Sequence, residues 1–186
     1  MCGRFVLHDV EGVKKKFNIE IKPSFNIAPS QEVLIYDKKP HIMKWSFSPI
    51  WAKKDFNLIN CRSETMYEKP SFKNTERCIF VLNGWYEWKR ENNEKQPYYF
   101  STNDIFFMGG LKNNKGCCVV TKEANKNLSQ IHKRQPILLK EKEINNWLNG
   151  ENFFNSKLDN EIKITKVSKK VNSPINNDRT NLIVVK

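Results

Sequence analysis

The sequence contains no long hydrophobic run. Lys, Asn and Asp interrupt every apolar stretch of the 186 residues, so no segment reaches the length of a membrane-spanning helix. The first residues, GRFVLHDVEG after the initial Met-Cys, contain no extended apolar region and do not have the pattern of a signal peptide. We therefore expect an intracellular protein without a membrane partner: cytoplasmic and associated with the nucleoid in a bacterium, or nuclear in a eukaryote.

The sequence also has no CxxC pair and only three histidines, which argues against a zinc site. Its cysteines are odd in number, and an odd number in an intracellular chain argues against a disulfide framework. Three of the five, Cys78, Cys117 and Cys118, lie in apolar strand-like runs, where we expect small buried side chains. The sequence thus predicts neither a metal nor an organic cofactor.

Repeats, low-complexity linkers and breaks in composition are absent as well, so we predict a single domain over residues 1–186. A hydrophobic content of 39% is enough for a packed core. Acidic residues are too few to balance the basic ones, and the formal net charge is +12. This charge suggests an anionic partner, with nucleic acid first and an anionic membrane surface second.

The hydrophobic pattern predicts many short strands and few helices. We expect helices at 9–17, 63–72, 124–132 and 140–150, a hairpin loop at 90–97, and strands at 3–8, 31–37, 41–48, 77–90, 96–102, 104–111, 116–123, 161–171 and 181–186. Helices scattered among antiparallel strands indicate an α+β fold. We predict a barrel-like, curved, mostly antiparallel β core flanked by short helices.

Cys2 is a candidate nucleophile if Met1 is removed, because it then carries an α-amine and a thiol on adjacent carbons. An α-amine has a pKa of about 7.8 against about 10.4 for lysine, so far more of it is neutral at physiological pH. Such an amine forms a Schiff base with an aldehyde, and the thiol can then close a thiazolidine ring. The alternative is that residue 2 is exposed and uninformative.

Glu87 lies in GWYEW, where strand alternation puts Trp85 and Glu87 on one face and Tyr86 and Trp88 on the other. Aromatic surface around the acid would remove water and raise its pKa toward the range useful for proton transfer. The alternative is an exposed acid on a half-buried strand.

Further candidates come from two separate segments. Asn60 and Arg62 in INCRSET offer a hydrogen-bonding amide and a phosphate-binding guanidinium, and loop capping with a surface ion pair to Glu64 is the alternative. His132 and Arg134 in IHKRQP offer an acid/base group and a second phosphate ligand. A structural histidine is the alternative there.

Two loop residues could press against unstacked bases. Pro29 lies in FNIAP and Trp51 in PIW. For Trp51 the alternative is a core or lid residue.

Taken together, seven segments in order resemble the SRAP (SOS-response-associated peptidase) family of proteins that crosslink to abasic sites in DNA. They are MCGRF, FNIAPSQ, WSFSPIW, LINCRSET, LNGWYEW, IHKRQPILL and KVSKKVN, and they cover nearly the whole chain. The resemblance implies the SRAP fold and a covalent sensor and shield of abasic sites in single-stranded DNA. After Met1 removal, Cys2 would form a thiazolidine DNA-protein crosslink.

The resemblance also implies a role for each candidate. Asn60 would hold Cys2 and the sugar oxygen, Glu87 would move protons in Schiff-base formation and reversal, and His132 would assist opening of the sugar ring. The phosphates that flank the lesion would be held by Arg4, Arg62 and Arg134. Pro29 and Trp51 would wedge beside the abasic gap.

The chain departs from the family pattern at Ser46, Ala52, Asn83 and Gln135. We expect these departures to affect the grip on DNA and the loop shapes more than the chemistry.

Two other functions use the same residues. One is a cysteine-nucleophile peptidase that removes its own Met1, with autopeptidase-type hydrolase activity beside a lyase-type activity. The other is a non-catalytic module that binds single-stranded nucleic acid through its charge and aromatic side chains. Nothing in the sequence requires more than a monomer.

Overall fold

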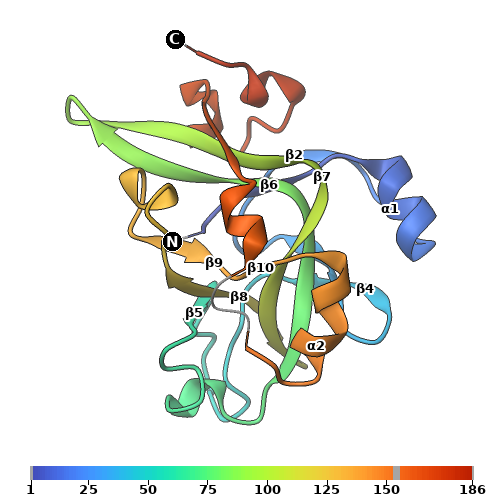
Figure 1. Cartoon of the computed structure of the whole chain (residues 1–186). Helices are drawn as coiled ribbons and strands as arrows, with labels where there is room; N and C mark the ends of the chain where they lie inside the picture. The colour runs from blue at the N-terminus through green and yellow to red at the C-terminus, as the bar shows by residue number, and fades with distance from the viewer. Residues whose placement is uncertain (1, 153–155, 186) are drawn as a thin grey trace.

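The computed structural model describes residues 2–152 and 156–185, and Met1 and Lys186 lie outside this part of the chain. Its centre is a curved sheet of 11 strands in which neighbouring strands follow the order β2-β1-β6-β7-β8-β5 (Figure 1). The strands are β1 Phe5–Leu7, β2 Ser24–Ile27, β3 Glu32–Tyr36, β4 Pro40–Lys44, β5 Asn60–Arg62, β6 Glu76–Glu91, β7 Glu94–Asn113, β8 Gly116–Glu123, β9 Arg134–Pro136, β10 Leu138–Leu139 and β11 Lys163–Lys166.

The pairing is antiparallel with one exception among the described strands, β5 beside β8. The path of paired strands runs from β2 to β5 without closing on itself in the described residues. The predicted α+β class, with a curved and mostly antiparallel core and short flanking helices, is confirmed.

β6 and β7 form a long curved hairpin that forms the centre of the fold (Figure 1). Its turn is Asn92-Asn93, and both residues have positive φ angles, 48° and 63°. Two positive φ angles are the geometry of a tight two-residue hairpin turn, which asparagine tolerates. The predicted loop at 90–97 is therefore in the right place but too long. The strands predicted at 96–102 and 104–111 are a single strand, with a register irregularity opposite Leu82–Gly84.

The first predicted helix is confirmed as α1, Val10–Phe17. Asp9 caps it by accepting a hydrogen bond from Gly12 N at 2.9 Å. The helix predicted at 140–150 is a 3₁₀ turn, Glu141–Glu143, continued by α2, Ile144–Leu148. It buries Ile144 and Trp147 and is followed by Gly150 at φ +103°.

Two predicted helices are reduced to single 3₁₀ turns, Pro70–Phe72 and Leu128–Gln130. Among the apolar side chains, 63–72 buries only Met66 and Phe72, and 124–132 buries only Leu128, so neither segment has the apolar stripe that stabilises a longer helix.

The last predicted strands are mostly wrong. The strand predicted at 161–171 is limited to β11, and at 181–185 the described chain makes only an isolated bridge from Val184 to Val167. Ser168 and Asp178 each accept a hydrogen bond from a backbone N–H two residues later, which starts the 3₁₀ turns Lys169–Asn172 and Arg179–Leu182.

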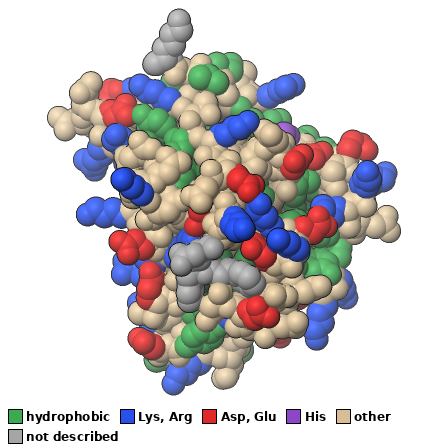
Figure 2. Space-filling model, in the orientation of Figure 1, with side chains coloured by type: hydrophobic (Ala, Val, Ile, Leu, Met, Phe, Trp, Pro, Cys, Tyr) green, Lys and Arg blue, Asp and Glu red, His purple; other side chains and the backbone are tan. Residues whose placement is uncertain are grey.

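The described residues contain no helix that is long and apolar enough to cross a membrane. The face in Figure 2 carries scattered Lys and Arg side chains, interleaved with acidic ones. On this face the excess positive charge is dispersed rather than collected into one stripe.

Candidate active site

Cys2 is fully buried, and it lies where β1 meets β6. Phe5 pairs with Trp85, and Tyr86 N donates to Arg4 O at 3.0 Å. This antiparallel register directs the residues before Phe5 along β6 toward Glu87. Residue 2 is therefore not exposed, contrary to that part of the alternative.

Asn60 reaches the same point from β5. Its Nδ2 donates to Cys2 O at 2.8 Å. Its Oδ1 is buried and accepts no hydrogen bond within the described residues. Because a buried acceptor without a donor is costly, this oxygen is suited to a donor supplied by a bound group. The parallel pairing of β5 with β8 holds Asn60 in place, and Val119 N donates to Ile59 O at 3.0 Å.

Glu87 is only 3% exposed, so the alternative of an exposed acid is wrong. It follows Trp85 and Tyr86 on β6, both of which are fully buried. Burial raises the pKa of Glu87 to about 7. At neutral pH this carboxyl can therefore both give and take a proton.

The thiol of Cys2 also responds to this environment. Burial raises its pKa, and the nearby charge of Glu87 raises it further. The thiol is therefore protonated at neutral pH and needs a base before it can act as a nucleophile.

His132 faces Glu87 from the segment that follows the 3₁₀ turn Leu128–Gln130. Its Nδ1 lies 3.9 Å from Glu87 Oε2. The same nitrogen lies 3.1 Å from Arg134 N and 3.0 Å from Arg134 O, so the backbone of β9 holds the ring. Burial lowers the pKa of His132, which favours the neutral imidazole at neutral pH.

Arg134 is engaged on both of its terminal nitrogens. Nη1 and Nη2 bind the carboxylate of Glu64 at 2.6 and 2.8 Å, and Nη2 also donates to Thr121 O at 2.7 Å. Its Nε is buried without a hydrogen-bond partner in the described residues. Glu64 was expected to form a surface ion pair, but its partner Arg134 was not predicted. The alternation of side chains along β8 and β9 puts Thr121 and Arg134 on the same face of the sheet. The position of the Glu64 loop against that face does not follow from the sequence and depends on the tertiary structure.

Arg4 and Arg62 differ in how they are held. Arg4 Nη1 donates to Asn26 Oδ1 at 2.9 Å and to Val171 O at 3.0 Å, and its guanidinium lies 5.9 Å from the ring centre of Trp88. Arg62 is exposed at the end of β5, two residues after Asn60. Arg62 is thus the more accessible of the two cations.

The two proposed wedge residues lie in separate loops. Trp51 is 60% exposed, so it is not a core residue, and its ring meets Phe56 edge to face at 5.3 Å. Pro29 is half-buried between β2 and β3, next to Ser30, which has a φ of 71°. The sequence did not indicate that Phe56 would accompany Trp51.

The structure accounts for three of the four departures: two make side-chain hydrogen bonds and one is buried. Asn83 Oδ1 accepts from the backbone N–H groups of His8 and Asp9 at 2.8 and 3.0 Å, so it shapes the turn into α1. Ser46 Oγ donates to Asn57 Oδ1 at 2.7 Å. Ala52 is buried, so its side chain does not contribute to the exposed surface around Trp51.

Metal chemistry has no evident ligand set here. In residues 2–152 and 156–185, no group of three or more His, Cys, Asp and Glu side chains is arranged to hold an ion. All five cysteines are buried and free.

Comparison with known proteins gives consistent matches. The family model "SOS response associated peptidase (SRAP)" matches residues 1–174. "Abasic site processing protein YoqW" of Bacillus subtilis is 32% identical over 216 aligned positions, covering 95% of this chain and 96% of that protein. "Abasic site processing protein YedK" of Escherichia coli is 28% identical over 81% of each chain.

A crystal structure of a protein from Bacteroides thetaiotaomicron has the same fold, with a TM-score of 0.73 at 22% identity. The match covers 97% of this chain and 92% of that one. Family model, relatives and fold agree over most of the length, and the chain belongs to the SOS response associated peptidase family.

Proposed function

We propose that this protein captures abasic sites in single-stranded DNA through Cys2, once Met1 has been removed. One observation carries the proposal: Cys2, Asn60, Glu87 and His132 come from four separate segments and converge. Asn60 Nδ2 lies 2.8 Å from Cys2 O, the charge of Glu87 acts on the Cys2 thiol, and His132 Nδ1 lies 3.9 Å from Glu87 Oε2. The names of the relatives YoqW and YedK support abasic DNA as the target.

The chemistry starts from the closed sugar of an abasic site. His132 assists proton transfer at the hemiacetal oxygens, which opens the ring and exposes the aldehyde. The α-amine of Cys2 adds to this aldehyde, and Glu87 in its acid form protonates the departing hydroxyl. One water leaves and a protonated imine forms.

Ring closure completes the adduct. Glu87, now a carboxylate, takes the proton of the Cys2 thiol, and the thiolate sulfur adds to the carbon of the protonated imine, which leaves a neutral ring nitrogen. The balance is one aldehyde and one aminothiol giving one thiazolidine and one water. The same carboxyl runs these steps backward in reversal of the crosslink, because a pKa of about 7 leaves both of its forms populated.

Binding of the single-stranded DNA relies on the positive charge of the protein and on stacking of bases against an aromatic ring. The net charge of +12 attracts nucleic acid without reading its sequence. Arg62 is accessible for a phosphate, and Trp51 offers an exposed ring for stacking. Arg4 and Arg134 would have to share or exchange their present partners to bind the flanking phosphates, and Pro29 would support the wedge.

Self-removal of Met1 is part of the proposal, whereas general proteolysis is not. Burial raises the pKa of the Cys2 thiol, so self-removal of Met1 through this thiol also needs a base to take its proton. We further propose that residues 1–186 form one domain acting as a monomer on DNA in the cytoplasm or nucleus.

The decisive experiment incubates purified protein with single-stranded DNA carrying one abasic site, followed by a denaturing gel and intact-mass analysis. We expect protein lacking Met1 and a denaturant-stable adduct lighter by one water than the sum of its parts. In Cys2→Ala the stable adduct should disappear, yet borohydride should still trap the imine of the α-amine.

Two outcomes would contradict the proposal. A band shift seen only under native conditions would favour a non-catalytic binding module. An adduct formed with Met1 still in place would exclude the aminothiol as the reacting group.

A further inference from the structure

A buried polar cluster lies beside the segment that carries His132. It consists of Lys122 on β8, Asn125, Gln135 on β9, and Asp159 in the 3₁₀ turn Lys157–Asn160. Lys122, Gln135 and Asp159 are 7%, 1% and 5% exposed. Buried polar groups need partners, so the contacts within this cluster restrict the backbone that makes them.

Asn125 is the centre of the cluster. Its backbone N–H donates to Gln135 Oε1 at 2.8 Å, and its Nδ2 donates to Asp159 O at 3.1 Å. Its Oδ1 accepts from Leu128 N at 2.8 Å, and its backbone carbonyl accepts from Ser129 N at 2.9 Å. Asn125 therefore links the start of the segment 124–133 both to β9 and to the 3₁₀ turn that carries Asp159.

Gln135 and Asp159 extend the cluster beneath β9. Lys122 pairs with Gln135 across β8 and β9, and Lys122 Nζ forms an ion pair with Asp159 Oδ2. Burial raises the pKa of Asp159, and the hydrogen bond and charge of Lys122 act to lower it. Gln135 Nε2 and Asp159 Oδ1 are a buried donor and a buried acceptor, and neither makes a hydrogen bond within the described residues.

The cluster is connected to the candidate active site through β9. Side chains alternate along a strand, so Gln135 enters the cluster while Arg134 points to the opposite face, toward Glu64. The backbone of the same Arg134 holds His132 Nδ1. Ala124 N donates to Lys133 O at 2.9 Å, so the two ends of the segment 124–133 lie side by side.

We propose that Gln135 and Asn125 are positioning residues, which hold the segment 124–133 so that the imidazole of His132 stays against Glu87. This inference rests on the proposed function, because it assigns the cluster to the ring-opening step. Small displacements of an acid/base group lower rates by up to about a hundredfold. Loss of the Gln135 contact should therefore slow capture of a closed sugar without changing the aminothiol.

The test compares two DNA substrates. The first carries a natural abasic site. The second carries an acyclic aldehyde without the hydroxyl that closes the ring, so it needs no ring opening. In Gln135→Met, which keeps the volume and removes the acceptor of the Asn125 N–H, we expect adduct formation to slow about tenfold on the first substrate and less than about twofold on the second.

Matched variants separate positioning from loss of stability. Gln96→Met removes another buried glutamine, whose Nε2 donates to Val167 O at 2.9 Å, and should leave both rates unchanged. Asn125→Asp keeps the acceptor for Leu128 N and loses the donor to Asp159 O. It should slow the natural substrate about threefold, and it provides the test if Gln135→Met does not fold.

The outcomes are distinguishable. Unchanged rates in folded Gln135→Met or Asn125→Asp, or equal slowing on both substrates, would overturn the positioning role while leaving capture of abasic sites intact. No adduct from the wild type with either substrate would overturn the proposed function, and the positioning role with it.

Discussion

At the scale of single residues, the fold alters the proton affinity of Glu87. Burial raises its pKa from 4.5 to about 7, so between these pH values the folded protein binds a proton that the unfolded chain has already lost. The free energy of unfolding therefore falls as the pH rises through this window. A carboxyl kept at this position in spite of the penalty is consistent with a chemical role.

We expect Glu87→Gln to remove the free-energy cost of burying an ionised carboxylate at this position. The variant should match the wild type in stability near pH 4 and exceed it by roughly 3 kcal/mol at pH 8. Adduct formation and reversal should both slow. Urea unfolding at several pH values and denaturing gels measure these effects, with Glu91→Gln on the same strand as the control. A variant less stable than the wild type at pH 8 would show that burial of the ionised Glu87 does not lower the free energy of unfolding.

Arg134 illustrates a second effect at this scale, the competition between a carboxylate and a phosphate. Glu64 binds both terminal nitrogens of Arg134, and this pairing lowers the pKa of Glu64 to about 2. A DNA phosphate that approaches Arg134 bidentately must displace that carboxylate.

Glu64→Gln should therefore tighten binding of undamaged single-stranded DNA. We expect a gain of about threefold to tenfold at low salt, with the slope of log K against log salt steeper by about 0.7. Fluorescence anisotropy across a salt series measures both. Glu68→Gln removes an equal charge from the same turn and serves as the control. Weaker binding in Glu64→Gln would instead mean that Glu64 orients Arg134 for the phosphate.

At the scale of elements, the β6–β7 hairpin positions Glu87, and its close packing requires a glycine. A Cβ on Gly84 would lie 2.5 Å from the carbonyl oxygen of Phe100 and 2.5 Å from the ring of Tyr99. Gly84 pairs with Ser101 beside the register irregularity of the hairpin. A side chain here would push the strands apart three residues from Glu87.

Gly84→Ala should lower the free energy of unfolding by about 1–3 kcal/mol. Ser101→Ala, on the paired residue, should change it by less than about 0.5 kcal/mol. Thermal or urea unfolding compares the two. Equal stability of Gly84→Ala and the wild type would show that the hairpin can open at this point without penalty.

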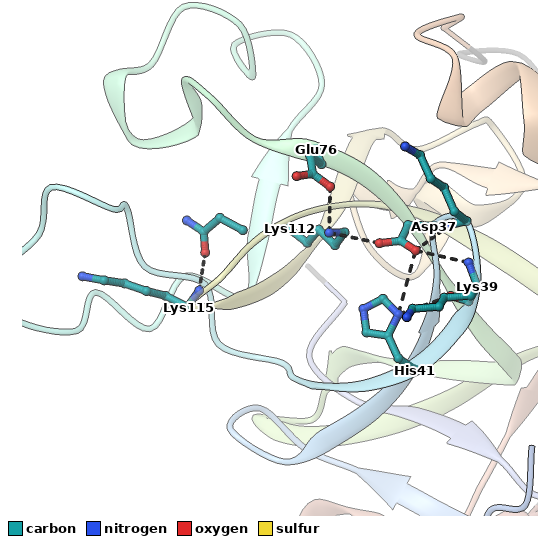
Figure 3. Close-up of polar contacts among 8 residues, drawn as sticks. Asp37, Lys39, His41, Glu76, Lys112 and Lys115 are labelled. Atoms are coloured by element: carbon teal, nitrogen blue, oxygen red, sulfur yellow. Dashed lines mark hydrogen bonds and ion pairs between the residues drawn. The ribbon is translucent and has the colours of Figure 1, made fainter.

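At the scale of the whole molecule, an ion cluster joins the β3–β4 turn to the far end of the central hairpin (Figure 3). Lys112 Nζ lies 3.0 Å from Asp37 Oδ2 and 2.8 Å from Glu76 Oε2. Burial alone would raise the pKa of Asp37, but the backbone N–H of Lys38 and the ammonium of Lys112 lower it to about 2. The cluster therefore stabilises the fold above pH 4 and weakens as the pH falls toward 2.

Asp37→Asn should cost about 1–2 kcal/mol at pH 7, and the difference from the wild type should shrink toward zero near pH 2. Acid titration of stability by circular dichroism measures this. Asp55→Asn, in an exposed loop, is the control. A difference that stays constant down to pH 2 would mean that Asp37 acts through packing rather than charge.

The sequence by itself determined the fold class, most strands and the cap of α1, and it supplied the candidate residues for the active site. These depend on local patterns: alternation, the capping residue Asp9, and the motifs around Cys2, Asn60, Glu87 and His132. Only the tertiary structure decided that the predicted helices at 63–72 and 124–132 are single turns. The reason is that helix length depends on how much apolar surface finds a partner.

The tertiary structure alone also decided the neighbours of each candidate. Asn60 meets Cys2 because β5 lies parallel to β8, and Arg134 meets Glu64 because β9 turns it toward that loop. Neither contact follows from spacing along the chain, since the partners are 58 and 70 residues apart. Burial, which sets the pKa values of Glu87 and Cys2, likewise exists only when distant segments exclude water together.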